Sequence, residues 1–437
     1  MGGKARYATD LWRRWCGSFI VVPSSCSCSV RYFEPTRQID CGNKTKVRAA
    51  PTRLARAEPD FTQRNRSDRE EMDDFDLDDD QPEDSTGELF FSLGLGSELG
   101  VNGEKDPVEA AKWYEAAVEK GNDSAKNNLG NMYIHGVGVE RNVGKGMALV
   151  TEAARNGLAA AQCNLGQMIE NGIGSTQSYS GAAEWYLKAA QQGLAEAQFR
   201  LGYLLEHGFV SKPDFWEAFA WYRLAAEQGL ADAQFNLGLC YREGKGAQVD
   251  LGRAVEWFRR AAVQGNAAAQ LFLGGAFAFG EGVPPNPQAA VDWYSRAANQ
   301  GLALAQRKLA IHYISTSPPN AAEAFRWYKR AAEQGDAEAQ YGLGVCFFNG
   351  QGTAQDRGEA AKWYLAAAKR GYGGAMRTLT DVYARGLGVP PDLVEAYYWC
   401  SEAIARLAGP PKAEMERYRE HLAERMSEAE LREAEER

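Results

Sequence analysis

The sequence predicts an all-α fold, an α-solenoid of about nine helix pairs that repeat at intervals of about 36 residues. Three observations predict it. A Trp recurs at one fixed place in the module, a stripe of Ala and aromatic residues accompanies each Trp, and glycines follow at fixed offsets. A fixed period of roughly 20 to 50 residues is typical of repeat arrays. The recurring residues are Trp113, Trp185, Trp221, Trp257, Trp293, Trp327, Trp363 and Trp399.

The first predicted helix of each module carries the Trp. In the module around Trp221, the residues Ala218, Trp221, Tyr222 and Ala225 stand at i, i+3, i+4 and i+7, which places them on one face of an α-helix. Gly229 is expected to end this helix, because glycine tolerates the left-handed conformation that a helix C-terminus commonly needs.

The second predicted helix carries a Leu-Gly pair. In the same module it places Ala233, Gln234, Leu237, Gly238 and Tyr241 on one side, and two further glycines turn the chain into the next module. A single hairpin so rich in Ala cannot bury enough apolar area by itself, so neighbouring hairpins must stack. We therefore interpret the Trp and Tyr rings as packing residues that fill the space beside Ala and Gly.

Two internal modules depart from the pattern. In one, Leu149 stands where the Trp belongs; in the other, the segment 315–320 is two residues short and lacks the paired glycines. Sequence drift explains both departures, and so would a local change in superhelix curvature that shapes a binding surface. At the ends of the array, residues 88–100 are predicted to be a second helix without its partner, and Pro410-Pro411 are expected to break the helix.

Composition divides the chain into four segments. Residues 1–57 are rich in Arg and Ser and poor in acids, which is typical of an organellar transit peptide, although a disordered basic leader or a secreted start would also fit. Residues 58–86 are dominated by Asp and Glu and are expected to be a disordered linker. The repeat solenoid is expected at 87–410, and a charged C-terminal helical cap at 411–437, because a solenoid needs polar end units.

The pattern A-x-x-W-Y-x-x-A-A-x-x-G-x-x-x-A-x-x-x-L-G-x-x-Y-x-x-G-x-G resembles the Sel-1-like repeat family, relatives of the tetratricopeptide repeat. The match recurs nearly whole at 182–208, 254–283, 324–352 and 360–389. The resemblance implies a right-handed superhelix of antiparallel helix pairs that serves as an interaction scaffold. It also implies that the first helices of the modules line the inner curve.

The sequence offers no catalytic, cofactor or metal site. The four His residues are scattered, and none stands at metal-ligand spacing from another His or a Cys. The glycines before Lys145 do not make a phosphate-binding loop, because Gly146 stands where Ser or Thr is needed. Cys240 and Cys346 occupy the same position three modules apart, too far to bridge, so reduced thiols are expected. We therefore expect a protein that is not an enzyme and holds no cofactor.

A row of basic residues is the candidate binding surface. Positions two and three residues after each Trp face away from the apolar stripe of the predicted first helix. If the first helices line the inner curve, the row runs along the concave surface. A solvated face would explain these charges as well as a ligand-reading surface does. The row consists of Lys188, Arg223, Arg259, Arg260, Arg296, Lys329 and Arg330.

The favoured function is a non-enzymatic scaffold or adaptor that binds a peptide or an acidic segment of a partner protein on this concave surface. The alternative is an organellar RNA-binding repeat protein whose basic row contacts phosphates. The chain holds 49 Lys and Arg against 58 Asp and Glu, a net charge of −9, which disfavours nucleic acid as the partner. The apolar stretch Phe19–Val22 is too short for a membrane span. The favoured location is an organelle, a mitochondrion before a plastid, with the cytoplasm as the alternative.

Overall fold

The structure is a computed structural model, and it describes residues 84–101 and 103–436. The chain divides into two units, residues 1–75 and 76–437, and everything described lies in the second unit. The predicted leader at 1–57 and most of the predicted acidic linker at 58–86 lie outside the described residues. The last three residues of that predicted linker are helical, because the first described helix begins at Asp84.

The described residues form 20 α-helices and no strand, which confirms the predicted all-α solenoid of helix pairs. Helices with the Leu-Gly position, called LG helices below, alternate with helices that carry the Trp-Tyr position, called WY helices. The LG helices are α2 (Asp84–Leu99), α4 (Asp123–His135), α6 (Ala159–Asn171), α8 (Ala195–Glu206), α10 (Ala231–Glu243), α12 (Ala267–Phe279), α14 (Ala303–Ser315), α16 (Ala337–Asn349) and α18 (Gly373–Arg385).

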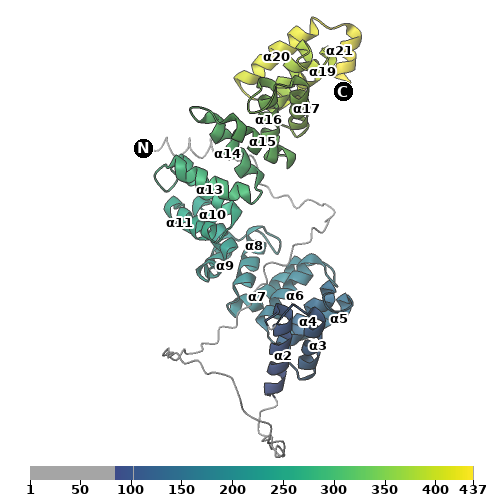
Figure 1. The fold of residues 1–437 in the computed structure, drawn as a ribbon, viewed down its shortest axis with the longest axis vertical. Helices are drawn as coiled ribbons and strands as arrows, with labels where there is room; N and C mark the ends of the chain where they lie inside the picture. Colours follow the sequence, from purple (N-terminus) through teal and green to yellow (C-terminus); the bar gives the residue numbers. More distant parts are fainter. Residues whose placement is uncertain (1–83, 102, 437) are drawn as a thin grey trace, which may run out of the picture. The chain divides into compact units, whose positions relative to one another are not determined.

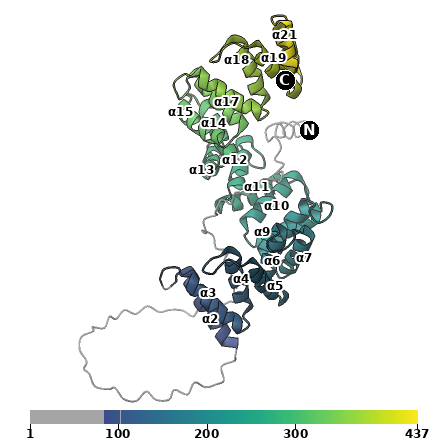
Figure 2. The same cartoon turned by 90° about the vertical axis from the view of Figure 1, so that its right-hand side faces the viewer.

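The WY helices fill the places between them. They are α3 (Pro107–Glu119), α5 (Val143–Arg155), α7 (Tyr179–Gln191), α9 (Phe215–Glu227), α11 (Leu251–Val263), α13 (Pro287–Asn299), α15 (Ala321–Glu333), α17 (Arg357–Lys369) and α19 (Leu393–Arg406). Each helix packs against the helices before and after it in the chain, so that α2 to α19 follow one another in sequence order (Figures 1 and 2).

Local sequence sets the ends of these helices. The carboxylate of Asp214 accepts hydrogen bonds from the backbone N–H groups of Trp216 and Glu217 at the start of α9 and thereby satisfies two donors that a helix leaves unpaired. Gly229 follows that helix with φ of +99°, as the sequence predicts. Gly244 then closes α10 in the left-handed conformation at φ of +74°.

The glycine of the LG helix gives the next WY helix its close approach. A Cβ built on Gly238 would lie 2.6 Å from the Phe258 ring, and one on Gly274 would lie 2.6 Å from the Tyr294 ring. In each case the ring belongs to the residue that follows the recurring Trp. The same contact joins Gly94 to Tyr114, Gly166 to Tyr186, Gly202 to Tyr222 and Gly344 to Tyr364.

Two modules show what happens without that glycine. In α14 the glycine position is occupied by Ala310, and Tyr328 of α15 is only half-buried. The Tyr328 ring lies instead beside Gly342 of α16, where a Cβ built on Gly342 would stand 2.5 Å from it. In α18 the position is Thr380, and the residue that faces it in α19 is the small, fully buried Cys400. Where the glycine is present, a larger side chain fills the space beside it, and where Thr380 replaces the glycine, the small Cys400 takes the place of the ring.

The recurring Trp has a different role from the aromatic residue that follows it. Tyr222 is fully buried inside its own helix pair, whereas Trp221 is half-buried. Trp257 packs against the buried cluster of the preceding helices α9 and α10. The interpretation of the Trp residues as packing residues holds, but they join neighbouring pairs, and the Tyr position fills the pair itself.

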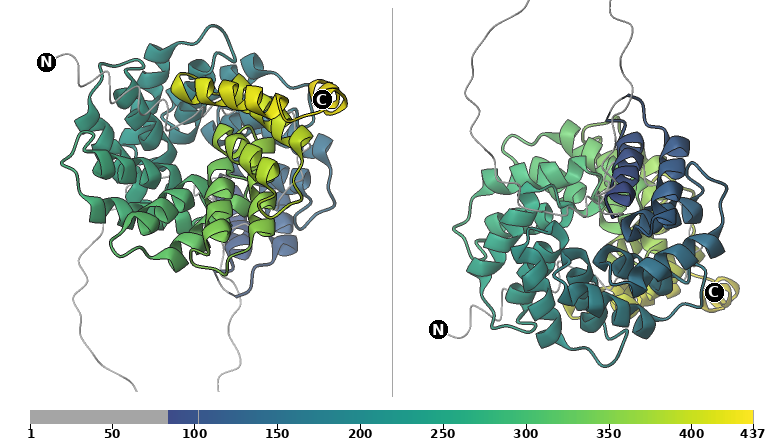
Figure 3. Two further views of the ribbon diagram at one scale, coloured as in Figure 1. Left: turned by 90° about the horizontal axis from the view of Figure 1, so that it is seen from above. Right: turned by 90° about the horizontal axis from the view of Figure 1, so that it is seen from below.

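The residues after the last WY helix form two helices, α20 (Pro410–Ala423) and α21 (Glu428–Glu435). The helix break predicted at Pro410-Pro411 comes earlier, because α19 ends at Arg406 and Pro410 starts α20, where a missing N–H has no cost. Met415 and Leu422 of α20 are buried. Both helices contact α19, and Figure 3 shows them across the end of the array.

Candidate functional site

All seven residues of the predicted basic row are exposed, and they lie on five WY helices, α7, α9, α11, α13 and α15. The residue three positions after the Trp stacks on that Trp. Lys188 Nζ lies 4.0 Å from the ring centre of Trp185, and the Arg260 guanidinium lies 4.3 Å from that of Trp257. Arg296 on Trp293 at 4.6 Å and Arg330 on Trp327 at 4.8 Å complete the series.

Three of these four cations stack on the indole face although an acidic residue stands one helical turn before them. Glu184, Glu256 and Asp292 stand four residues before Lys188, Arg260 and Arg296, a spacing that supports ion pairs on a helix. Asp292 instead accepts a hydrogen bond from Gln288 at 3.1 Å. A cation over an aromatic face is attracted by the ring quadrupole, and its outer side stays open to solvent.

The residues two positions after the Trp are held more loosely. Arg223 lies 3.9 Å from Glu227, and Lys329 lies 4.0 Å from Glu333, one helical turn away in each case. Exposed pairs of this kind contribute at most about 1 kcal/mol. The row therefore contains four cations fixed on rings and a second set whose charge is partly balanced by acids.

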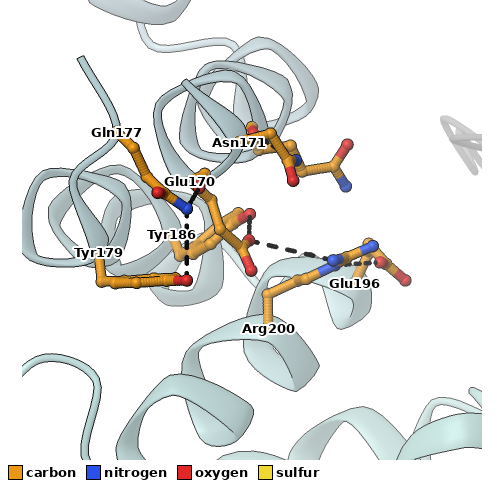
Figure 4. Close-up of polar contacts among 8 residues, drawn as sticks. Glu170, Asn171, Gln177, Tyr179, Tyr186, Glu196 and Arg200 are labelled. Carbon is orange, nitrogen blue, oxygen red and sulfur yellow. Dashed lines mark hydrogen bonds and ion pairs between the residues drawn. The ribbon is translucent and has the colours of Figure 1, made fainter. Parts of the chain in front are cut away.

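The half-buried carboxylate of Glu170 joins three consecutive helices, α6, α7 and α8 (Figure 4). The hydroxyl of Tyr186 donates to Glu170 Oε2 at 2.5 Å, and Arg200 lies 4.0 Å from the same oxygen. Arg200 also pairs with Glu196 at 2.9 Å. The side chain of Gln177 donates to the backbone carbonyl of Glu170 at 2.8 Å, which fixes the loop after α6.

The same arrangement recurs one module later. Tyr222 donates to Glu206 at 2.8 Å, and Lys245 lies 3.2 Å from that carboxylate. Burial raises the pKa of both the Tyr186 and the Tyr222 hydroxyl, and the neighbouring carboxylates raise it further. These hydroxyls therefore remain protonated at neutral pH and act as hydrogen-bond donors that hold neighbouring helices together.

A ladder of buried glutamines runs through the array, and the sequence analysis missed it. Gln234 Nε2 donates to the carbonyl of Ala226 at 3.2 Å, and its Oε1 accepts from Gln264 at 2.8 Å. The donor is the Gln at the C-cap of the next WY helix. The signal was present as Gln at the end of each A-x-A-Q sequence. The acceptors are Gln162, Gln198, Gln234, Gln270 and Gln306, with the donors Gln192, Gln228, Gln264, Gln300 and Gln334.

The glutamine ladder stops at α16. Gln340 still donates to Ala332, but its Oε1 is buried without a hydrogen-bond partner. The position 30 residues later, which holds the donating Gln in the earlier modules, is Arg370. The guanidinium of Arg370 lies instead over Gly335, 2.7 Å from where a Cβ would stand.

The remaining chemistry of the described residues is limited. Within residues 84–101 and 103–436, no group of three or more His, Cys, Asp or Glu side chains could hold a metal ion. No helix of that part of the chain has both the length and the hydropathy to cross a bilayer. Its cysteines Cys163, Cys240, Cys346 and Cys400 are buried.

Comparison with protein families identifies the repeat and confirms the resemblance seen in the sequence. The Sel1 repeat model matches more than half of the chain, in nine segments. They are residues 91–122, 123–158, 159–194, 195–230, 231–266, 267–302, 303–336, 337–372 and 381–406.

Two of the similar solved structures are described as a Sel1 repeat protein and as a protein with an SLR fold. A Sel1 repeat protein from Oxalobacter formigenes is 29% identical, and the match covers 68% of this chain and 87% of that chain with a TM-score of 0.54. A protective antigen present in uropathogenic Escherichia coli strains, which displays an SLR fold, is 30% identical over 81% of this chain and 83% of that chain, with a TM-score of 0.47. No curated protein matches the sequence.

The matched segments reverse the order of the helices that the sequence analysis assumed. The segment 231–266 begins with α10 and ends with α11, so the LG helix comes first and the WY helix second. Helix α2 is therefore the first helix of a complete pair with α3, and the prediction of a second helix without its partner was wrong. The basic row lies on second helices, so the reason given for placing it on the inner curve does not hold.

Proposed function

Because the chain belongs to the Sel1 repeat family, whose members generally act as protein-interaction scaffolds, we propose that it is a non-enzymatic adaptor that binds an acidic segment of a partner protein. The binding surface is the basic row on the exposed side of the WY helices. The observation that carries the proposal is the stacking of Lys188, Arg260, Arg296 and Arg330 on Trp rings.

Stacking prepares a cation for a carboxylate in two ways. It restricts the rotamers of a long side chain before the partner arrives, which lowers the entropy cost of binding. It also occupies the face of an Arg guanidinium, while the N–H groups at its edge stay free for a bidentate contact with a carboxylate. Three of these residues, Arg260, Arg296 and Arg330, come from three consecutive WY helices, so an extended acidic segment could contact them together.

The test is binding of a defined peptide to the full-length protein, measured by fluorescence anisotropy. An Asp/Glu-rich peptide should bind, and a peptide of the same length with Asn and Gln should not. Binding should weaken as salt rises, because exposed charges are screened over about 8 Å at physiological ionic strength. Tighter binding of an RNA oligonucleotide of matched length would favour the RNA-binding alternative, which the family comparison does not support.

Charge reversal separates the basic row from the overall charge of the protein. The variant with Arg260→Glu, Arg296→Glu and Arg330→Glu should lose peptide binding and keep its helical content. The matched control reverses three exposed cations that pair with acids of their own helices, Lys362, Arg385 and Arg432. Equal loss in both variants would mean that general charge, and not the row, attracts the peptide, and the proposed surface would be abandoned.

We also propose import into an organelle, on the basis of the Arg-rich, acid-poor composition of residues 1–57. A fluorescent reporter fused behind these residues should collect in mitochondria, or in plastids where the host has them. Uniform cytosolic fluorescence would remove this proposal and leave the adaptor function untouched.

A further inference from the structure

The first described helix, α2, exposes two side chains at positions that every later LG helix of the described residues buries. Leu89 on α2 is 57% exposed, and Leu93 is 39% exposed. At the equivalent positions of α10, Ala233 and Leu237 are both 0% exposed. The same two positions are buried in every LG helix from α4 to α18, always as an Ala and a Leu.

In those later modules the covering element is the preceding WY helix. Ala233 and Leu237 of α10 share a buried cluster with Ala225 and Ala226 of α9. The residues that stand at the equivalent of this Ala-Ala pair before α2 are Gln81-Pro82. Proline removes a helical hydrogen bond and clashes with the preceding turn, so the upstream sequence does not repeat the WY pattern.

The opposite end of the array is already covered. Met415 and Leu422 of α20 are 2% and 0% exposed and belong to the buried cluster of α17, α18 and α19. Cys400 of α19 donates from its thiol to the backbone carbonyl of Met415 at 3.2 Å. The α19 face on which a further LG helix would pack is therefore already occupied by the chain's own α20, and it is not open to the α2 helix of a second copy.

We propose that two copies of this chain pair through their α2 helices, antiparallel and related by a two-fold axis. An axis between Ser92 and Leu93 sets Leu89 of one copy against Gly96 of the other. A Cβ built on Gly96 would meet nothing within 4 Å, so the position has room for a Leu side chain. Such a face is complementary to itself, as a two-fold interface requires.

The charges of α2 do not oppose this contact. Glu98 accepts a hydrogen bond from the Tyr114 hydroxyl at 2.5 Å, and Glu88 accepts one from Asn122 at 3.2 Å. Both carboxylates are thus held by groups of the same copy, toward α3 and α4. The exposed face between them offers Leu89, Leu93 and Gly96, all uncharged, so two copies bring apolar area together without facing like charges.

The test is the mass of the full-length protein in sedimentation equilibrium. The protein should sediment as a dimer, at about twice its chain mass of 48.0 kDa. Leu89→Glu should raise the dissociation constant at least about tenfold, because it buries a charge in the contact. Gly96→Arg, a change at an open helical position that the fold can accommodate, should do the same by filling the place of the opposing Leu89.

The matched control is Val263→Glu, which puts the same charge at a 70% exposed apolar position on α11, away from α2. This variant should remain a dimer. A wild-type monomer at concentrations up to about 100 µM would overturn the proposal, including the case in which the chain's own residues 1–83 cover α2. A dimer that survives both Leu89→Glu and Gly96→Arg would place the contact elsewhere and overturn it equally.

Discussion

Glycine, which has a hydrogen atom where alanine has a methyl group, lets an LG helix and the following WY helix pack closely. Gly274 of α12 accepts the ring of Tyr294 where a Cβ would stand, and its neighbour Gly275 has only the Tyr294 hydroxyl oxygen at 3.7 Å. Both glycines lie in the interior of the same helix. One is required by a close approach, and the other only loses the helix propensity that Ala would provide.

These two glycines should therefore respond to the same change with opposite signs. Gly274→Ala should lower the free energy of unfolding by about 1 kcal/mol or more, because overpacking costs about 1–3 kcal/mol and outweighs the gain in helix propensity. Gly275→Ala should raise it by up to about 1 kcal/mol. Urea unfolding followed by circular dichroism measures both. Destabilisation of equal size in the two variants would contradict the packing account.

The buried thiols give a second test at the residue scale. Burial raises the pKa of Cys240 to about 12 and that of Cys346 and Cys400 to about 11. At pH 8 these three should stay protonated and resist iodoacetamide in the folded protein, since the thiolate is the reactive form. Peptide mass spectrometry should find them modified only after unfolding in guanidinium. Rapid native labelling of any of the three would show a local opening that the packing does not predict.

At the scale of the helices, the glutamine ladder connects each LG helix to the two WY helices beside it. Gln234 donates to Ala226 at the end of α9 and accepts from Gln264 at the C-cap of α11. Buried polar groups cost free energy unless they are paired, so each rung is stabilising only while it is complete. The unpaired oxygen of Gln340 marks the rung that lacks its donor.

Restoring that donor should stabilise the array. Arg370→Gln places the amide at the position it has in five earlier modules and should raise the free energy of unfolding by about 1 kcal/mol. The converse change, Gln264→Ala, breaks a complete rung and should lower it by about 1–3 kcal/mol, because the oxygen of Gln234 loses its partner. Thermal and urea unfolding of both variants give the signs. A destabilised Arg370→Gln would mean that the packing of Arg370 over Gly335 matters more than the missing hydrogen bond.

At the scale of the whole array, each helix touches mainly its neighbours in the chain, and the buried residues of the described helices form a series of separate clusters. Stability in such an array is close to a sum of repeat terms and nearest-neighbour terms. The two ends differ: α20 and α21 cover the last WY helix, whereas the LG helix α2 leaves Leu89 and Leu93 exposed. Local damage should therefore stay local, and the ends should behave differently.

Hydrogen exchange can measure how far a local change spreads. In the Gly274→Ala variant, amides of α12 and α13 and of the pairs on either side should exchange faster than in the wild type. Amides of α4 and α18, several repeats away, should keep their protection. Uniform loss of protection from α4 to α18 would show that the array unfolds as one cooperative unit, against the nearest-neighbour account.

The sequence by itself determined the helix pairs, their period and their ends. The Ala-Trp-Tyr-Ala spacing, the glycines at Gly229 and Gly244 and the caps such as Asp214 act within one or two turns of the chain, so they could be recognised without tertiary structure. The exposed positions of the basic row followed from the same helical spacing. The order of the two helices in a repeat, with the Trp helix first, was wrong, and the family match corrected it.

Only the tertiary structure decided which groups meet across helices. It shows that Tyr222 fills the helix pair while Trp221 stays half-exposed, that Gln234 pairs with Gln264, and that Arg260 stacks on its Trp in preference to an acid four residues away. These contacts join residues on separate helices, or they select one of two neighbours that both lie about one helical turn away. Their outcome depends on how closely the backbones approach, which side chains are desolvated and which polar atoms remain unpaired, and none of these is a property of one helix alone.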